Sequence, residues 1–151
     1  MSQVSKQEDN LEGTLVGLLG LAIVIFVTGL AYYFIAGSAP SNMNDVDLPT
    51  VSCVGIFGLG MFLYGSVGII QGKIVIGWGT VNQVRTTLAG AGALVASSST
   101  VIGGLLILAP VAIYFVPELI SVVHPLAALL CGLVAPVVGW ISGPIIRALG
   151  Y

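Results

Sequence analysis

Four long apolar stretches dominate the chain, and shorter polar stretches separate them. The apolar stretches cover residues 13–36, 51–72, 88–116 and 126–149, and their only charged residue is Arg147, near the end of the fourth. At a rise of about 1.5 Å per residue, each is long enough to cross roughly 30 Å of hydrocarbon as a helix. The pattern predicts an all-α, polytopic integral membrane protein with four transmembrane helices.

Small residues gather on one side of these predicted helices. The stretch from Leu88 to Gly104 has no charge and few bulky side chains, and at 100° per residue its small residues share one face. In lipid, helices associate through close backbone approach, which small residues permit. Spans two and four repeat the pattern, so we expect a compact bundle. The predicted packing face comprises Gly65, Gly68, Gly72, Gly92, Ala96, Thr100, Gly104, Ala135, Gly139 and Gly143.

The overall composition agrees with a lipid environment. Hydrophobic residues make up 57% of the 151 residues, charged residues only 7%, and the mean hydropathy is +1.10. Soluble domains contain roughly 25% charged residues. We expect a polar amino-terminal tail over residues 1–12, with Asn10 capping the first helix, and a single membrane domain over residues 13–151. The net charge of −2 and the lack of a basic cluster argue against nucleic-acid binding.

The first apolar stretch is expected to remain as a membrane span. A cleaved signal peptide usually has an apolar core of about 7–15 residues, which is shorter than residues 13–36. The stretch follows a single lysine among acidic residues, and Pro40 follows the small residues at which cleavage would occur. These features favour a retained helix.

Charge predicts the orientation of the four spans. A four-span topology places every basic residue on one side of the membrane: Lys6, Lys73, Arg85 and Arg147. The loops expected on the other side contain acidic residues and neither lysine nor arginine. Because positively charged loops stay in the cytoplasm, we expect both termini there, in the cell (inner) membrane.

Residues 72–87, between spans two and three, are neither clearly apolar nor clearly water-exposed. Their β-branched residues flank a Gly-Trp-Gly sequence, which predicts either a short hairpin or an interfacial segment with Trp78 at headgroup level. The long side chains of Lys73 and Arg85 would reach lipid phosphates. These three residues are candidate contacts to a partner or to headgroups, and an ordinary interfacial connection is the alternative.

Candidate chemistry is sparse. Coupled transporters and proton paths keep ionisable residues within their spans, and these spans lack them apart from the terminal Arg147. Ser97 and Thr100 at mid-depth of span three are candidates for a polar path, although such hydroxyls commonly bond to their own helix. We interpret His124 as an interfacial residue and Cys53 and Cys131 as small apolar residues, because their spacing matches no metal, haem or disulfide motif.

The sequence thus favours a structural or accessory subunit that packs closely against itself or a larger membrane complex. Lipid, other membrane subunits or further copies of the chain are the expected partners. The alternative is a passive channel or small-solute carrier whose path runs along Ser97 and Thr100. No nucleophile with a base and no phosphate-binding loop is evident, so we expect neither an enzyme nor a bound cofactor.

Overall fold

The structure, a computed structural model, describes residues 3–38, 48–76, 86–121 and 123–150. Its elements, in chain order, are α1 (Gln3–Ser38), α2 (Leu48–Gln71), β1 (Lys73–Ile76), β2 (Thr86–Ala89), α3 (Gly90–Phe115), the 3-10 helix η1 (Pro117–Ser121) and α4 (Pro125–Ala148). Within these ranges, four segments are long and apolar enough to span a membrane: Thr14–Gly37, Val51–Gln71, Gly90–Phe115 and Pro125–Ala148. The prediction of an all-α bundle of four membrane helices is confirmed.

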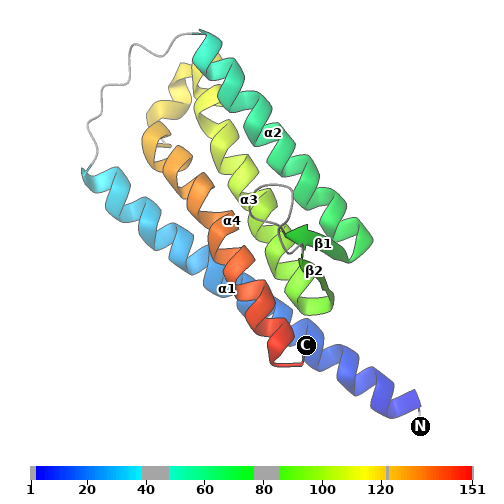
Figure 1. The fold of residues 1–151 in the computed structure, drawn as a ribbon. Coiled ribbons are helices and arrows are strands. Elements are labelled where there is room, and N and C mark those ends of the chain that lie inside the picture. The colour runs from blue at the N-terminus through cyan, green and yellow to red at the C-terminus, as the bar shows by residue number, and fades with distance from the viewer. Residues whose placement is uncertain (1–2, 39–47, 77–85, 122, 151) are drawn as a thin grey trace.

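The helix α3 lies at the centre of the bundle (Figure 1). It packs along α2 on one side and along α4 on the other, and α1 packs across both α3 and α4. Among the described residues, α2 makes extensive contacts with only one other long helix. Accordingly, buried residues make up 44% of an 18-residue apolar stretch in α3 and in α4, against 22% in α1 and 17% in α2. The two central helices form the core, and the two outer ones present most of their surface to lipid.

Both termini lie at the same end of the bundle as the β1–β2 hairpin, and η1 lies at the opposite end (Figure 1). This arrangement follows because four helices run along the bundle, and an even number of them returns the chain to the end at which it started. It places Lys73 and Arg147 at the end that carries the termini, and Glu118 of η1 at the other.

The helix α1 begins earlier than the sequence pattern indicates. It starts at Gln3 and runs without interruption to Ser38, so Asn10 lies inside the helix and the prediction that it caps the first span is wrong. The reason is local propensity. The segment from Gln3 to Leu11 contains no Pro or Gly and includes Gln, Lys, Glu and Leu, which are good helix formers even outside an apolar span.

The segment between α2 and α3 contains a hairpin, which is one of the two structures that its sequence allows. The strands β1 and β2 pair antiparallel, with Lys73 opposite Ala89 and Ile76 opposite Thr86. Gly72, with φ of 62°, and Gly90, with φ of 64°, lie at the junctions with α2 and α3. Only glycine adopts this left-handed conformation without a steric penalty from Cβ.

The hairpin corrects the predicted start of span three and the predicted end of span two. Leu88 and Ala89 belong to β2, and α3 begins only at Gly90. Gly72 lies after the last residue of α2 rather than in it. Apolar character extends without a break from the strand into the helix, so hydropathy alone does not mark this boundary. Trp78 and Arg85 lie outside the described residues.

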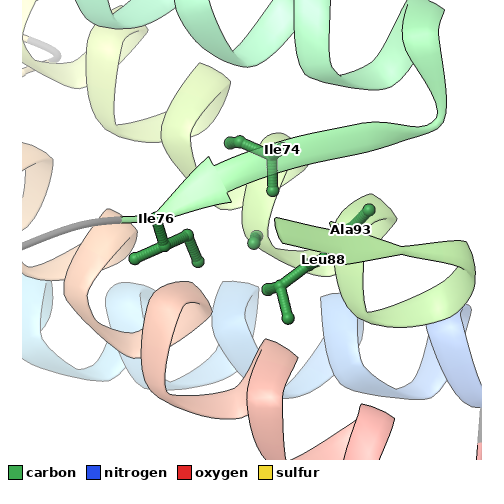
Figure 2. Close-up of a cluster of buried hydrophobic side chains, with 5 residues drawn as sticks. Ile74, Ile76, Leu88 and Ala93 are labelled. Carbon is green, nitrogen blue, oxygen red and sulfur yellow. The ribbon is translucent and has the colours of Figure 1, made fainter. Parts of the chain in front are cut away.

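One face of the hairpin is buried in the bundle. The inward side chains Ile74, Ile76 and Leu88 pack with Ala93 and Ala96 of α3 (Figure 2). The outward residues alternate with them along the strands, as the two-residue period of a β-strand requires. The hairpin is therefore part of the core and not a loose connection.

Side chains from two helices satisfy carbonyl groups of the hairpin. Val75 and Thr87 are opposite each other in the ladder. The Tyr64 hydroxyl of α2 donates to the Val75 carbonyl oxygen, and the Arg147 guanidinium of α4 donates to the Thr87 carbonyl oxygen at 2.8 Å. A strand carbonyl without a hydrogen-bond partner is costly at a membrane, where little water is available to replace the partner. These two bonds therefore stabilise the hairpin.

Candidate functional site

The α2–α3 interface is built on glycines whose backbones nearly touch the neighbouring helix. A Cβ on Gly65 would lie 2.7 Å from the Ser97 carbonyl oxygen, and one on Gly104 would lie 2.6 Å from the Phe62 amide nitrogen. Real Cβ atoms essentially never approach other atoms this closely. Any side chain at these positions would therefore force the two helices apart.

The α3–α4 interface contains the same kind of glycine contact at two places along the helices. Near the hairpin, a Cβ on Gly92 would lie 2.6 Å from the Gly143 carbonyl oxygen. Further along, a Cβ on Gly103 would lie 2.6 Å from the Gly132 carbonyl oxygen. In each pair the reverse substitution meets the partner glycine's carbonyl at 2.9 Å. Reciprocal glycine contacts thus bring the backbones of α3 and α4 too close together for a side chain at any of these four positions.

On α1, Gly17 and Gly20 have side chains as their nearest neighbours and not the backbone of the neighbouring helix. A Cβ on Gly17 would meet Leu94 Cδ2 at 3.2 Å, and one on Gly20 would meet Val95 Cγ2 at 2.8 Å. These neighbouring atoms belong to side chains, which can shift, and not to backbone. The outer helix α1 is therefore less tightly bound to α3 than α2 and α4 are.

Nine of the ten residues of the predicted packing face lie at contacts between helices or in the interior. Gly65, Gly68 and Gly104 lie between α2 and α3, Gly92, Gly139 and Gly143 lie between α3 and α4, and Ala96, Thr100 and Ala135 are buried. Gly72 is the exception and is a correction: with its positive φ it serves the turn after α2, and a Cβ there would meet no atom within 4 Å.

Three further glycines lie at these interfaces, and each belongs to the small-residue face of its own span although it is not among the ten residues named above. Gly58 contacts α3, and Gly103 and Gly132 contact each other across α3 and α4. The prediction that Gly103 and Gly104 share one contact face is corrected by the structure, in which they contact different helices. Gly103 is adjacent to Gly104 and so points about 100° away from it, which directs Gly103 toward α4 and Gly104 toward α2. Two small residues in succession on a central helix are the sequence signal for two separate contact faces.

The hydroxyl groups of α3 bond within the protein. Ser99 Oγ donates to the Ala96 carbonyl oxygen at 2.8 Å, and Thr100 Oγ1 donates to the same oxygen at 2.7 Å. Trp140 Nε1 of α4 donates to Thr100 Oγ1 at 3.0 Å. Thr100 therefore acts as donor and acceptor at once and links the backbone of α3 to α4.

The two residues of the predicted polar path face different helices. Ser97 is fully buried against Gly68 of α2, and its Oγ has no hydrogen-bond partner among the described residues. Thr100 is 1% exposed and lies against Trp140 of α4. Each hydroxyl faces a tightly packed contact, so their arrangement gives no support to a common path through the bundle.

His124 joins α1 to the start of α4. Its backbone N–H donates to the Tyr32 hydroxyl oxygen at 2.7 Å, and its Nδ1 accepts from the Ala127 N–H at 3.4 Å as the N-cap of α4. Across the residues that the structure describes, no group of three His, Cys, Asp or Glu is placed to hold a metal ion. The two cysteines are free, with Cys53 exposed and Cys131 buried.

An open groove of about 310 Å³ lies between α2 and the hairpin. It is lined by Tyr64, Val67, Gly68, Gln71, Lys73, Ile74, Val75 and Thr87. Lys73 is the described member of the three candidate headgroup or partner contacts, and its side chain is exposed. The groove thus combines apolar walls with one cationic group.

Comparison with known proteins adds no family to this description. No known protein family, no curated protein and no solved structure matches the chain. Inferences about function therefore rest on the helix contacts, the buried hydroxyls and the hairpin.

Proposed function

We propose that this chain is a structural or accessory subunit that packs against further copies of itself or against a larger membrane complex. The observation that carries the proposal is the open arrangement of the bundle. Among the described residues, α3 is the only long helix along which α2 packs, and only 17% of the 18-residue apolar stretch of α2 is buried. In a complete assembly, another helix beside α2 would bury apolar surface that this chain leaves exposed.

The exposed surface of α2 has the features of a helix-docking surface. Large side chains such as Ile56 and Ile70 are 75% and 84% exposed. Between them, a Cβ on Gly60 would meet no atom within 4 Å, and the same holds for Gly29 on α1. A small residue between bulky ones leaves space for close approach by another helix, which is the main source of helix affinity in lipid.

The interior supports a packing role over a transport role. The hydroxyls of Ser99 and Thr100 bond to their own helix, and Ser97 lies against glycine. Because Ser97 and Thr100 face different neighbouring helices, no feature of the described residues favours the channel alternative, and we propose no second function.

The protein's association is tested in mild detergent and by cross-linking in the native membrane. We expect an oligomer, or a partner that copurifies at a fixed ratio. Leucine at Gly60 is sterically free in the isolated chain and should block a helix that docks on α2, whereas leucine at Gly29 tests α1 in the same way. A partner-free monomer under all these conditions would contradict the proposal.

We further propose that the protein lies in the cell (inner) membrane with both termini in the cytoplasm. The support is that β1, which begins at Lys73, and the last turn of α4, which contains Arg147, lie at the end with the termini, since cytoplasmic ends are enriched in basic residues. In a variant lacking Cys53 and Cys131, a single cysteine at Glu118 should react with an impermeant maleimide on intact cells. A cysteine at Gly150 should react only after permeabilisation, and the reverse result would refute this orientation.

A further inference from the structure

The groove beside the hairpin exists because of how α2 ends. Gly68 has no side chain and packs directly against Ser97, so α2 contributes only backbone to the groove lining at this position. Gly72 then reverses the chain, so that β1 runs beside the last turns of α2. The Tyr64 hydroxyl bonds the Val75 carbonyl and fixes the aromatic ring as one wall.

The groove is polar at one end and apolar at the other. Gln71 and Lys73 lie at the end of α2 and just beyond it, and Thr87 contributes a hydroxyl from β2. Val67 and Tyr64 lie one and two turns further into the apolar span and are 47% and 44% exposed. The described lining contains no Asp or Glu, so its only charge is the Lys73 ammonium.

The depth of the groove matches the headgroup region of a bilayer. The apolar span of α2 ends at Gln71, so Lys73 follows it by two residues. A lysine at this depth extends its ammonium toward lipid phosphates while its methylene groups remain at the apolar boundary. The volume of about 310 Å³ is at the lower limit for small-molecule sites, which suits a headgroup and the first part of an acyl chain.

We propose that this groove binds one anionic phospholipid. The lipid phosphate pairs with the Lys73 ammonium and accepts hydrogen bonds from the Gln71 amide and the Thr87 hydroxyl. One acyl chain lies along Val67 and the ring of Tyr64, toward the bilayer interior. The proposal is independent of the protein's role as a subunit, because the groove is formed within a single chain.

Native mass spectrometry with defined lipids tests the site. The detergent-solubilised protein is incubated with equal amounts of phosphatidylglycerol and phosphatidylcholine, and we expect one retained lipid per chain, with phosphatidylglycerol preferred. Lys73→Gln should reduce that preference about fivefold, as expected for one basic residue near an anionic headgroup. Lys6→Gln, which removes the other lysine, is the matched control and should leave the preference unchanged. Equal losses in the two variants would overturn the proposal, because they would indicate a general charge effect.

A second pair of variants tests the groove itself. Tryptophan at Val67 fills the groove from an exposed position on α2, so it should eliminate the retained lipid without unfolding the helix. Tryptophan at Leu63, exposed on the same helix but outside the lining, should not. Retention of the lipid by Val67→Trp would overturn the proposal. Displacement of the lipid by soluble glycerol phosphate would also overturn it, because the site would then recognise a free anion and not a lipid.

Discussion

Alanine at Gly103 should force α3 and α4 apart. The added Cβ would lie 2.6 Å from the Gly132 carbonyl oxygen and 2.7 Å from Pro136 Cδ. The first of these atoms is backbone and the second belongs to a rigid ring, so neither can rotate away. The clash can be relieved only by separating the helices or by distorting one of them.

The expected loss of stability in Gly103→Ala follows from the geometry of this contact. An ordinary carbon–oxygen contact is about 3.3 Å or longer, so the Gly103 substitution requires a separation of about 0.7 Å. A gap of about 0.5–1 Å forfeits roughly a quarter to a half of the dispersion energy of the atoms involved. Overpacking in well-packed interiors typically costs about 1–3 kcal/mol, and we expect the free energy of unfolding to fall by that amount.

For the isolated chain, dispersed as a monomer in the micelles, the matched control is alanine at Gly60 on α2, where a Cβ would meet no atom within 4 Å. This variant should be as stable as the wild type or more stable by about 0.5–1 kcal/mol, because alanine is the better helix former. Both variants are compared by circular dichroism during SDS titration in mixed micelles. If Gly103→Ala and Gly60→Ala unfold at the same SDS fraction, close backbone contact does not hold α3 to α4 and the argument is refuted.

Three further predictions test single interactions. Trp140→Phe removes the donor to Thr100 Oγ1 and should lower the free energy of unfolding by about 0.6 kcal/mol, with little further loss when Thr100→Val is added in a double-mutant cycle. Arg147→Gln should speed amide hydrogen exchange in the two hairpin strands, because it removes the bond to the Thr87 carbonyl, and unchanged exchange would exclude this bond as a restraint. Gly90→Ala places Cβ in a left-handed conformation and should cost about 1–2 kcal/mol in the same SDS titration, whereas a neutral result would mean that the junction of β2 and α3 relaxes easily.

The membrane spans could be predicted because the relevant property is local. Hydropathy places the four spans at residues 13–36, 51–72, 88–116 and 126–149, and the structure agrees to within about two residues at each end. Lipid offers no hydrogen bonds to the backbone, so a long apolar segment must form a helix whatever surrounds it. The polar residues before the first span obey no such rule, and α1 accordingly extends through them to Gln3.

The hairpin could be predicted only in part. β-Branched residues and glycines allowed a hairpin, but the same apolar residues also fit the start of a helix. Leu88 belongs to β2 because it packs with Ile74 and Ile76 and because Gly90 turns the chain. Those contacts depend on residues more than ten positions apart, which a local pattern does not contain.

By itself, the sequence determined that this protein is a set of four apolar helices with small residues on their inner sides. Tertiary structure alone decided which helix each small residue contacts. Gly103 and Gly104 are neighbours in sequence but face α4 and α2, and Ser97 and Thr100 are directed to different helices in the same way. The physical reason is that hydropathy is a sum over one segment, whereas a packing contact depends on the rotation and crossing of two helices that the intervening chain does not specify.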